Sequence, residues 1–146
     1  MHPLTVLASD VPHLATGLGG IRLILHVTAA AVWVGGQITM TGLLPTIRGF
    51  GADAPKKAAR ALAWLLWPAF ALLVVTGFWN IAALTTKDAS SAWNAVLGIK
   101  MGVVVVAGVA VFLHQRATTK AGLAIWGSVG GVASVAALCL GVFLAG

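Results

Sequence analysis

The sequence predicts an all-α, polytopic membrane protein, folded as a four-transmembrane-helix bundle with both termini outside. Of its 146 residues, 60% are hydrophobic and 8% are charged, and the mean hydropathy is +1.01, far above the range of soluble domains. The apolar residues gather in four stretches of roughly 20 residues, the length of a helix that crosses a bilayer. Lys and Arg are concentrated in two of the connections between these stretches, as is typical of cytoplasmic loops.

Two prolines help to define the predicted spans. We expect the first span to end at Pro45, because proline disfavours a helical backbone in the residue before it. Pro68 predicts a kink near the start of the second span. The segment 1–20 is expected to be an outer N-terminal segment, followed by a four-helix transmembrane domain at 21–146. The predicted spans are residues 21–44, 61–84, 92–113 and 121–145.

The cations decide the predicted topology. A formal net charge of +6 and an isoelectric point near 10.5 would suggest a nucleic-acid partner for a soluble protein. Here most of the Lys and Arg residues lie in the connections between the predicted spans. We therefore expect the lipid bilayer as the partner, and we do not expect a nucleic acid. Because both basic connections lie on one side, assigning that side to the cytoplasm places both termini outside, in a multi-pass protein of the plasma membrane. The two connections carry Arg48, Lys56, Lys57 and Arg60, and then Arg116 and Lys120.

A polar stripe follows one face of the first span. Lipid cannot satisfy polar side chains, so this face must meet protein, water or a ligand. Spacings of three and four residues place its members on one side of a helix. The stripe consists of Arg22, His26, Ala29, Ala30, Trp33, Gln37 and Met40.

His26 and Lys100 are expected at similar depth in the outer half of the membrane. Counted from the outer ends of their spans, they lie roughly 8 and 12 Å deep. A lysine at such depth costs about 2.5–3.5 kcal/mol unless it is paired or solvated. Its stem could snorkel to the interface, but a buried lysine would suit a ligand carboxylate. We therefore expect both residues to belong to one site.

Residues of the other two spans reach the same predicted layer. On the second span these are Thr76, Trp79 and Asn80, and on the fourth Ser134 and Cys139 bracket the level.

Tryptophan positions separate one residue from the rest. Trp33 is expected roughly 18 Å into its span, too deep for an interfacial belt. The remaining tryptophans fall near the predicted interfaces, as an aromatic belt would. They are Trp79 and Trp93 at the outer interface, and Trp64, Trp67 and Trp126 at the inner one.

The remaining candidate residues limit the possible sites. His114 lies at the inner end of its span, roughly 20 Å in depth from His26, which argues against a haem held by both. The single cysteine, Cys139, excludes an intramolecular disulfide and a cysteine-ligated zinc site. Small residues on the fourth span indicate close helix packing, a seam compatible with a homo-oligomer. They are Gly127, Gly131, Ser134 and Gly141.

Three segments resemble a known family. The run Leu-His-Val-Thr-Ala-Ala-Ala-Val-Trp-Val-Gly-Gly at 25–36 resembles the first helix of copper resistance protein D (CopD)-like membrane domains and of the related HemJ-type protoporphyrinogen oxidases. Residues 59–80, ending in Thr-Gly-Phe-Trp-Asn, resemble their second helix, and 93–100 resembles their lysine-bearing third helix. The fourth predicted span departs from the pattern.

The resemblance implies a four-helix bundle. HemJ-type proteins pair a first-helix histidine with a third-helix lysine and are thought to bind haem b, and His26 and Lys100 match these positions. This resemblance to HemJ-type proteins implies an oxidoreductase, whose redox partner the sequence does not identify. CopD-like proteins are instead linked to copper uptake or tolerance.

Three functions are therefore compared. In the first, a haem b or porphyrin-binding redox protein, His26 is the axial metal ligand, Trp33 and Trp79 flank the macrocycle, and Arg22 or Lys100 neutralises propionates. In the second, the protein handles copper, which favours thioether, thiolate and imidazole ligands. The third is a structural membrane subunit without a cofactor. The copper candidates are Met40, Met101, Cys139 and His26, with His2 and His13 as an outer collection site.

Overall fold

The computed structural model describes residues 17–83 and 89–145, and within them every regular element is an α-helix. The helices are α1 (Gly17–Arg48), α2 (Ala54–Ala83), α3 (Ser91–Arg116) and α4 (Lys120–Ala145). Each is long and apolar enough to cross a membrane. The chain is therefore an all-α, multi-pass membrane protein with a four-helix bundle.

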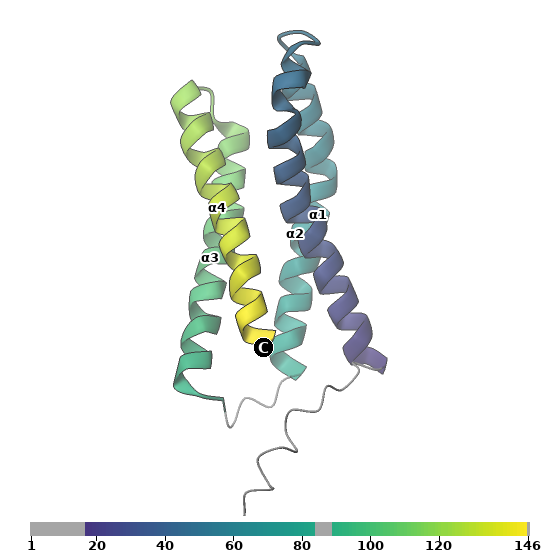
Figure 1. Ribbon diagram of the computed structural model, residues 1–146, viewed down its shortest axis with the longest axis vertical. Helices are drawn as coiled ribbons and strands as arrows, with labels where there is room; N and C mark the ends of the chain where they lie inside the picture. Colours follow the sequence, from purple (N-terminus) through teal and green to yellow (C-terminus); the bar gives the residue numbers. More distant parts are fainter. Residues whose placement is uncertain (1–16, 84–88, 146) are drawn as a thin grey trace, which may run out of the picture.

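The bundle consists of two helical hairpins that stand side by side (Figure 1). Helix α1 packs along α2 and α3 packs along α4, while the backbones of the two hairpins approach each other mainly between α1 and α4. Both the α1–α2 and the α3–α4 connections lie at the upper end of Figure 1, and α1 begins and α4 ends at the other. The two basic connections thus share one end of the bundle, here called the basic end, and the opposite end is called the terminal end.

The predicted end of the first span at Pro45 is wrong, because α1 continues through Pro45 to Arg48. A proline within a helix removes its own N–H, which would otherwise bond to the carbonyl four residues earlier. Membrane helices tolerate this loss, since local adjustments satisfy the freed group. The helix closes only afterwards, where Gly49 N–H donates to the Thr46 carbonyl at 3.0 Å.

The second helix begins earlier than predicted, at Ala54 rather than residue 61. Pro55 lies in its first turn, where a missing N–H has no helical partner to lose. The backbone N–H of Lys57 donates to the Asp53 carbonyl at 3.0 Å. The α1–α2 connection is consequently only residues 49–53, and Lys56, Lys57 and Arg60 lie on the first turns of α2.

An aromatic cluster joins the two hairpins in the half of the bundle nearer the basic end. The Trp33 ring lies 4.5 Å from Phe70 and 6.0 Å from Trp67, centroid to centroid. Trp67 in turn meets Phe112 of α3 edge to face at 6.4 Å. Gly108 of α3 makes room for Phe70, because a Cβ there would lie 2.7 Å from the Phe70 Cζ. Trp67, predicted as part of an interfacial belt, therefore also packs within the bundle.

A second contact between the hairpins is polar. The Ser134 hydroxyl on α4 accepts from Trp33 Nε1 at 3.0 Å and from Gln37 Nε2 at 3.1 Å. It donates to the Gly130 carbonyl of its own helix at 2.7 Å. Trp33 and Ser134 are both buried, at 3% exposure each. This network satisfies two polar side chains of the α1 stripe inside the bundle and fastens α1 to α4.

Candidate functional site

The site is built around His26, a half-buried residue on α1. Its Nδ1 lies 2.8 Å from the hydroxyl oxygen of Thr76 on α2, and Thr76 is only 1% exposed. The Thr76 hydroxyl also lies 2.6 Å from the Leu72 carbonyl of its own helix. A hydroxyl has a single proton, and the short contact to a carbonyl places that proton toward Leu72. Thr76 then accepts from His26 Nδ1–H, which leaves the lone pair of Nε2 available for a ligand.

A glycine beside Thr76 provides the surface on which the imidazole rests. A Cβ at Gly77 would lie 3.7 Å from His26 Cε1, an ordinary van der Waals distance. An alanine side chain at this position would therefore fit against the ring without a clash. Sequence reasoning did not assign a role to Gly77, although it belongs to the Thr-Gly-Phe-Trp run.

Lys100 lies on α3 and is half-buried. Its ammonium group lies against Gly141 of α4, where a Cβ would be 3.0 Å from Nζ. In residues 17–83 and 89–145 the only acidic side chain is Asp53, between α1 and α2 at the basic end. No described carboxylate therefore neutralises Lys100.

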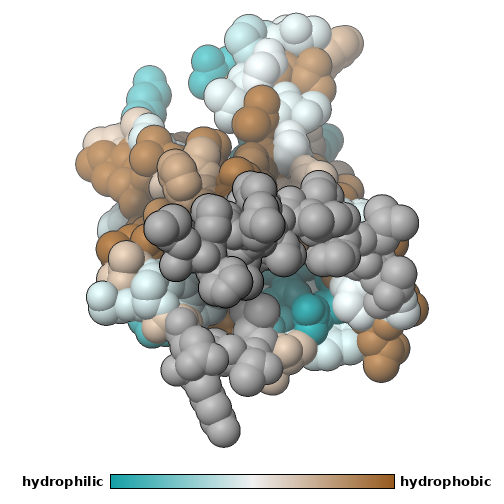
Figure 2. Space-filling model, turned by 60° about the horizontal axis from the view of Figure 1, so that its bottom comes forward, coloured by the Kyte–Doolittle hydropathy of each residue, from teal (hydrophilic) through white to brown (hydrophobic). Residues whose placement is uncertain are grey.

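Arg22 adds a second cation one helical turn from His26, nearer the terminal end. It is half-buried, and its Nε is buried without a hydrogen-bond partner among the described residues. A buried N–H of this kind costs free energy until an acceptor is supplied. Arg22 thus supplies a cation and an unused donor one turn from His26 toward the terminal end. Figure 2, which brings that end forward, shows hydrophilic side chains between the apolar outer surfaces.

The other predicted site residues lie less centrally. Trp79 is 40% exposed, and Asn80 is half-buried on the same turn of α2. Trp33 lies about 10 Å along the axis of α1 from His26, at 1.5 Å per residue, where its indole belongs to the aromatic cluster and donates to Ser134. The structure therefore joins His26 to Thr76, with Arg22 one helical turn away on α1, and it places Trp33 in a separate layer.

The residues considered for copper are not gathered in the same way. Among the described residues, no group of three or more His, Cys, Asp or Glu side chains could hold a metal ion. Met40 lies about 21 Å along α1 from His26, at 1.5 Å per residue. Cys139 is exposed on α4. The proposed outer collection site, His2 and His13, lies outside the described residues.

His114 has a role at the basic end that the sequence did not reveal. Its Nδ1 donates to the Leu123 carbonyl of α4 at 2.9 Å, since a carbonyl can only accept. The ring rests on Gly127, where a Cβ would lie 3.0 Å from Nδ1. His114 thus ties α3 to α4, and Gly127 of the predicted seam leaves room for its ring.

Comparisons with protein-family models, with curated proteins and with solved structures give no match for this chain.

Proposed function

We propose that this protein binds haem b as an integral membrane redox protein, with His26 as the axial ligand. The observation that supports this most directly is the hydrogen bond between His26 Nδ1 and the buried Thr76 hydroxyl. Metal-ligating histidines almost always donate their second ring N–H to such an acceptor, which fixes the tautomer and the orientation of the ring. The remaining nitrogen, Nε2, is then a neutral imidazole ligand.

The surrounding charges suit the carboxylates of a porphyrin. A haem b molecule combines an apolar macrocycle with two propionates, so its site needs an apolar slot and cations. Arg22, one helical turn from His26, and Lys100 of α3 are half-buried cations, and Arg22 Nε lacks a partner in the described part of the chain. Trp79 and Asn80 lie nearby on α2 and would complete the walls. When bound, haem b supplies one-electron redox chemistry.

The location of the site follows from the same proposal. We assign the basic end to the cytoplasm and the terminal end to the outside of a plasma membrane, as the concentration of cations favours. The haem would then lie in the outer half of the bilayer. An oxidoreductase activity of the HemJ type would be consistent with this arrangement and would require a separate electron partner.

Absorbance of the purified protein tests the haem proposal. Protein produced with haem supplied should show a Soret band, which His26→Ala should lose because the axial bond is absent. His114→Ala is a matched control, since His114 lies at the basic end and donates to Leu123, and it should keep the band. Helical circular dichroism should be similar for all three proteins. A wild-type Soret band in His26→Ala, or none in the wild type, would overturn the assignment.

A second variant separates ligation from charge neutralisation. Lys100→Ala removes a counter-charge but leaves Nε2 of His26 in place, so the Soret band should persist while haem retention weakens or the reduction potential shifts. Retention is measured by transfer of haem to apomyoglobin, and the potential by redox titration. If both quantities equal the wild-type values, Lys100 has no part in binding haem.

A further inference from the structure

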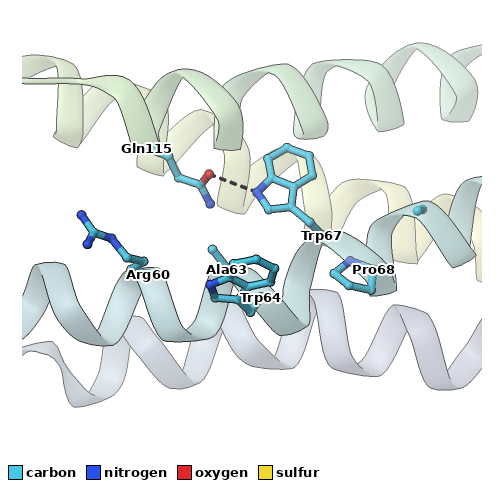
Figure 3. A pocket seen from close by; sticks show the side chains of 7 residues that line it. Arg60, Ala63, Trp64, Trp67, Pro68 and Gln115 are labelled. Atoms are coloured by element: carbon cyan, nitrogen blue, oxygen red, sulfur yellow. Dashed lines mark hydrogen bonds between the residues drawn. The ribbon is translucent and has the colours of Figure 1, made fainter.

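A groove at the basic end lies apart from the histidine site. It has a volume of about 490 Å³ and runs along α2 beneath the end of α3 (Figure 3). One side chain of α3, Gln115, overhangs residues of α2. The groove is lined by Arg60, Ala63, Trp64, Trp67, Pro68 and Gln115, with Ala71 at its far end.

The two ends of this groove differ in polarity. Arg60 and Gln115 lie toward the basic end of the bundle, and the remaining lining side chains are apolar or aromatic. The oxygen of Gln115 accepts from Trp67 Nε1 at 3.0 Å. Its amide NH₂ has no partner among residues 17–83 and 89–145 and can donate to a ligand. Arg60 and Gln115 both line this end of the groove, and guanidinium and amide donors bind anionic oxygens.

The length of the groove matches one leaflet of a membrane. From Arg60 to Ala71 the helix rises about 16 Å, half of a hydrocarbon core of about 30 Å. Trp64 is 81% exposed on the outer surface of the helix, where it meets lipid because α2 crosses the membrane. A ligand in the groove would therefore have its polar group near the interface and an apolar chain along Trp67 and Pro68.

We propose that this groove binds an anionic phospholipid from the leaflet at the basic end. Its phosphate would accept from Arg60 and from the Gln115 amide, and an acyl chain would lie along the apolar remainder of the groove. A free phosphate would leave the apolar part unused, whereas a lipid fills both parts. This site is independent of haem, since no residue of the histidine site takes part.

Quenching of tryptophan fluorescence by brominated lipids tests the proposal. Trp64 and Trp67 line the groove. A brominated lipid bound there therefore quenches their fluorescence more than a brominated lipid that diffuses freely in the bilayer. The protein is reconstituted in phosphatidylcholine vesicles with a small fraction of brominated phosphatidylglycerol, or with the same fraction of brominated phosphatidylcholine. The wild type should prefer phosphatidylglycerol by about fivefold, the effect of one cation near the surface.

Two variants and one control distinguish a built site from general attraction by the basic end. Arg60→Gln removes the cation, and Gln115→Glu keeps an acceptor for Trp67 while adding a negative charge. Both should lose most of the preference for phosphatidylglycerol. Lys120→Gln removes a cation that begins α4 at the same end, outside the groove lining, and it should keep the preference. Circular dichroism checks that each variant is folded.

Each alternative gives a distinct result. Equal quenching by the two brominated lipids in the wild type would overturn the proposal. Loss of the preference in Lys120→Gln to the same extent as in Arg60→Gln would show that only the overall charge matters, and would also overturn it. Inorganic phosphate at 10-fold excess over the brominated lipid should not reduce the preference at constant ionic strength. If it abolishes the preference, the groove takes free phosphate and not a lipid.

Discussion

The imidazole Nδ1 of His26 and the hydroxyl of Thr76 lie 2.8 Å apart and join α1 to α2 inside the bundle. Since Thr76 is 1% exposed, this acceptor cannot be replaced by water without rearrangement. The same hydroxyl contacts the Leu72 carbonyl at 2.6 Å, so the proton positions at both atoms are coupled. The availability of Nε2 of His26 therefore depends on a residue of the neighbouring helix.

Thr76→Val tests this dependence, because valine keeps the shape of threonine and removes the acceptor. We expect haem affinity to fall roughly 10- to 100-fold, as for other partners of a metal-ligating histidine. Affinity is measured by titrating the apoprotein with haem at the Soret maximum. Thr41→Val is the control, since Thr41 is exposed and its hydroxyl donates to the Gln37 carbonyl of its own helix. Equal affinities in both variants would contradict the role of Thr76.

Ser134→Ala tests the polar contact between the hairpins. It leaves Trp33 Nε1 without an acceptor and removes one from Gln37, within an apolar interior. An unsatisfied buried donor costs about 1–3 kcal/mol, and the free energy of unfolding should fall by this amount. The measurement is unfolding in mixed micelles with increasing dodecyl sulfate, followed by circular dichroism. Ser128→Ala, at an exposed position of α4, should leave the transition unchanged.

Gly108→Ala tests the fit between α2 and α3. Its Cβ would lie 2.7 Å from Cζ of Phe70, and that ring packs on Trp33 at 4.5 Å. The ring must shift, and overpacking of this kind costs about 1–3 kcal/mol. Gly102→Ala is the matched control on the same helix, because no atom lies within 4 Å of its added Cβ. The same unfolding assay should give a lower midpoint for Gly108→Ala alone. Equal midpoints would show that the aromatic cluster adapts without cost.

The sequence was sufficient for the number and the order of the helices, because a bilayer prescribes the length of each apolar stretch. It also placed both basic connections at one end. The helix ends were less predictable: α1 passes through Pro45, since in lipid an interrupted helix is costlier than one lost hydrogen bond. For the site, counting residues along the predicted spans placed His26 and Thr76 at the same depth in the membrane, and the structure joins them by a hydrogen bond.

The interior partners of Trp33 and Trp67 were not predictable in the same way. Apart from the polar stripe of α1, these helices are apolar on all sides, so hydrophobic periodicity does not indicate which neighbouring helix each face meets. Trp33 was expected beside a ligand, and instead its indole N–H donates to Ser134. Trp67 was expected at an interface, and its N–H donates to Gln115 of α3. Such pairings depend on how the two hairpins rotate against each other, which a single sequence does not specify.

The orientation in the membrane yields the last prediction. A Ser90→Cys variant, in a background of Cys139→Ser, should react with a membrane-impermeant maleimide added to intact cells, and Lys57→Cys should not. Ser90 is exposed directly before α3 at the terminal end, and Lys57 is exposed on the first turns of α2 at the basic end. Both should react once the cells are permeabilised, which shows that each thiol is accessible. Because cations are retained on the cytoplasmic side, the reverse pattern would contradict the assignment of the basic end and would move the haem site to the inner half of the bilayer.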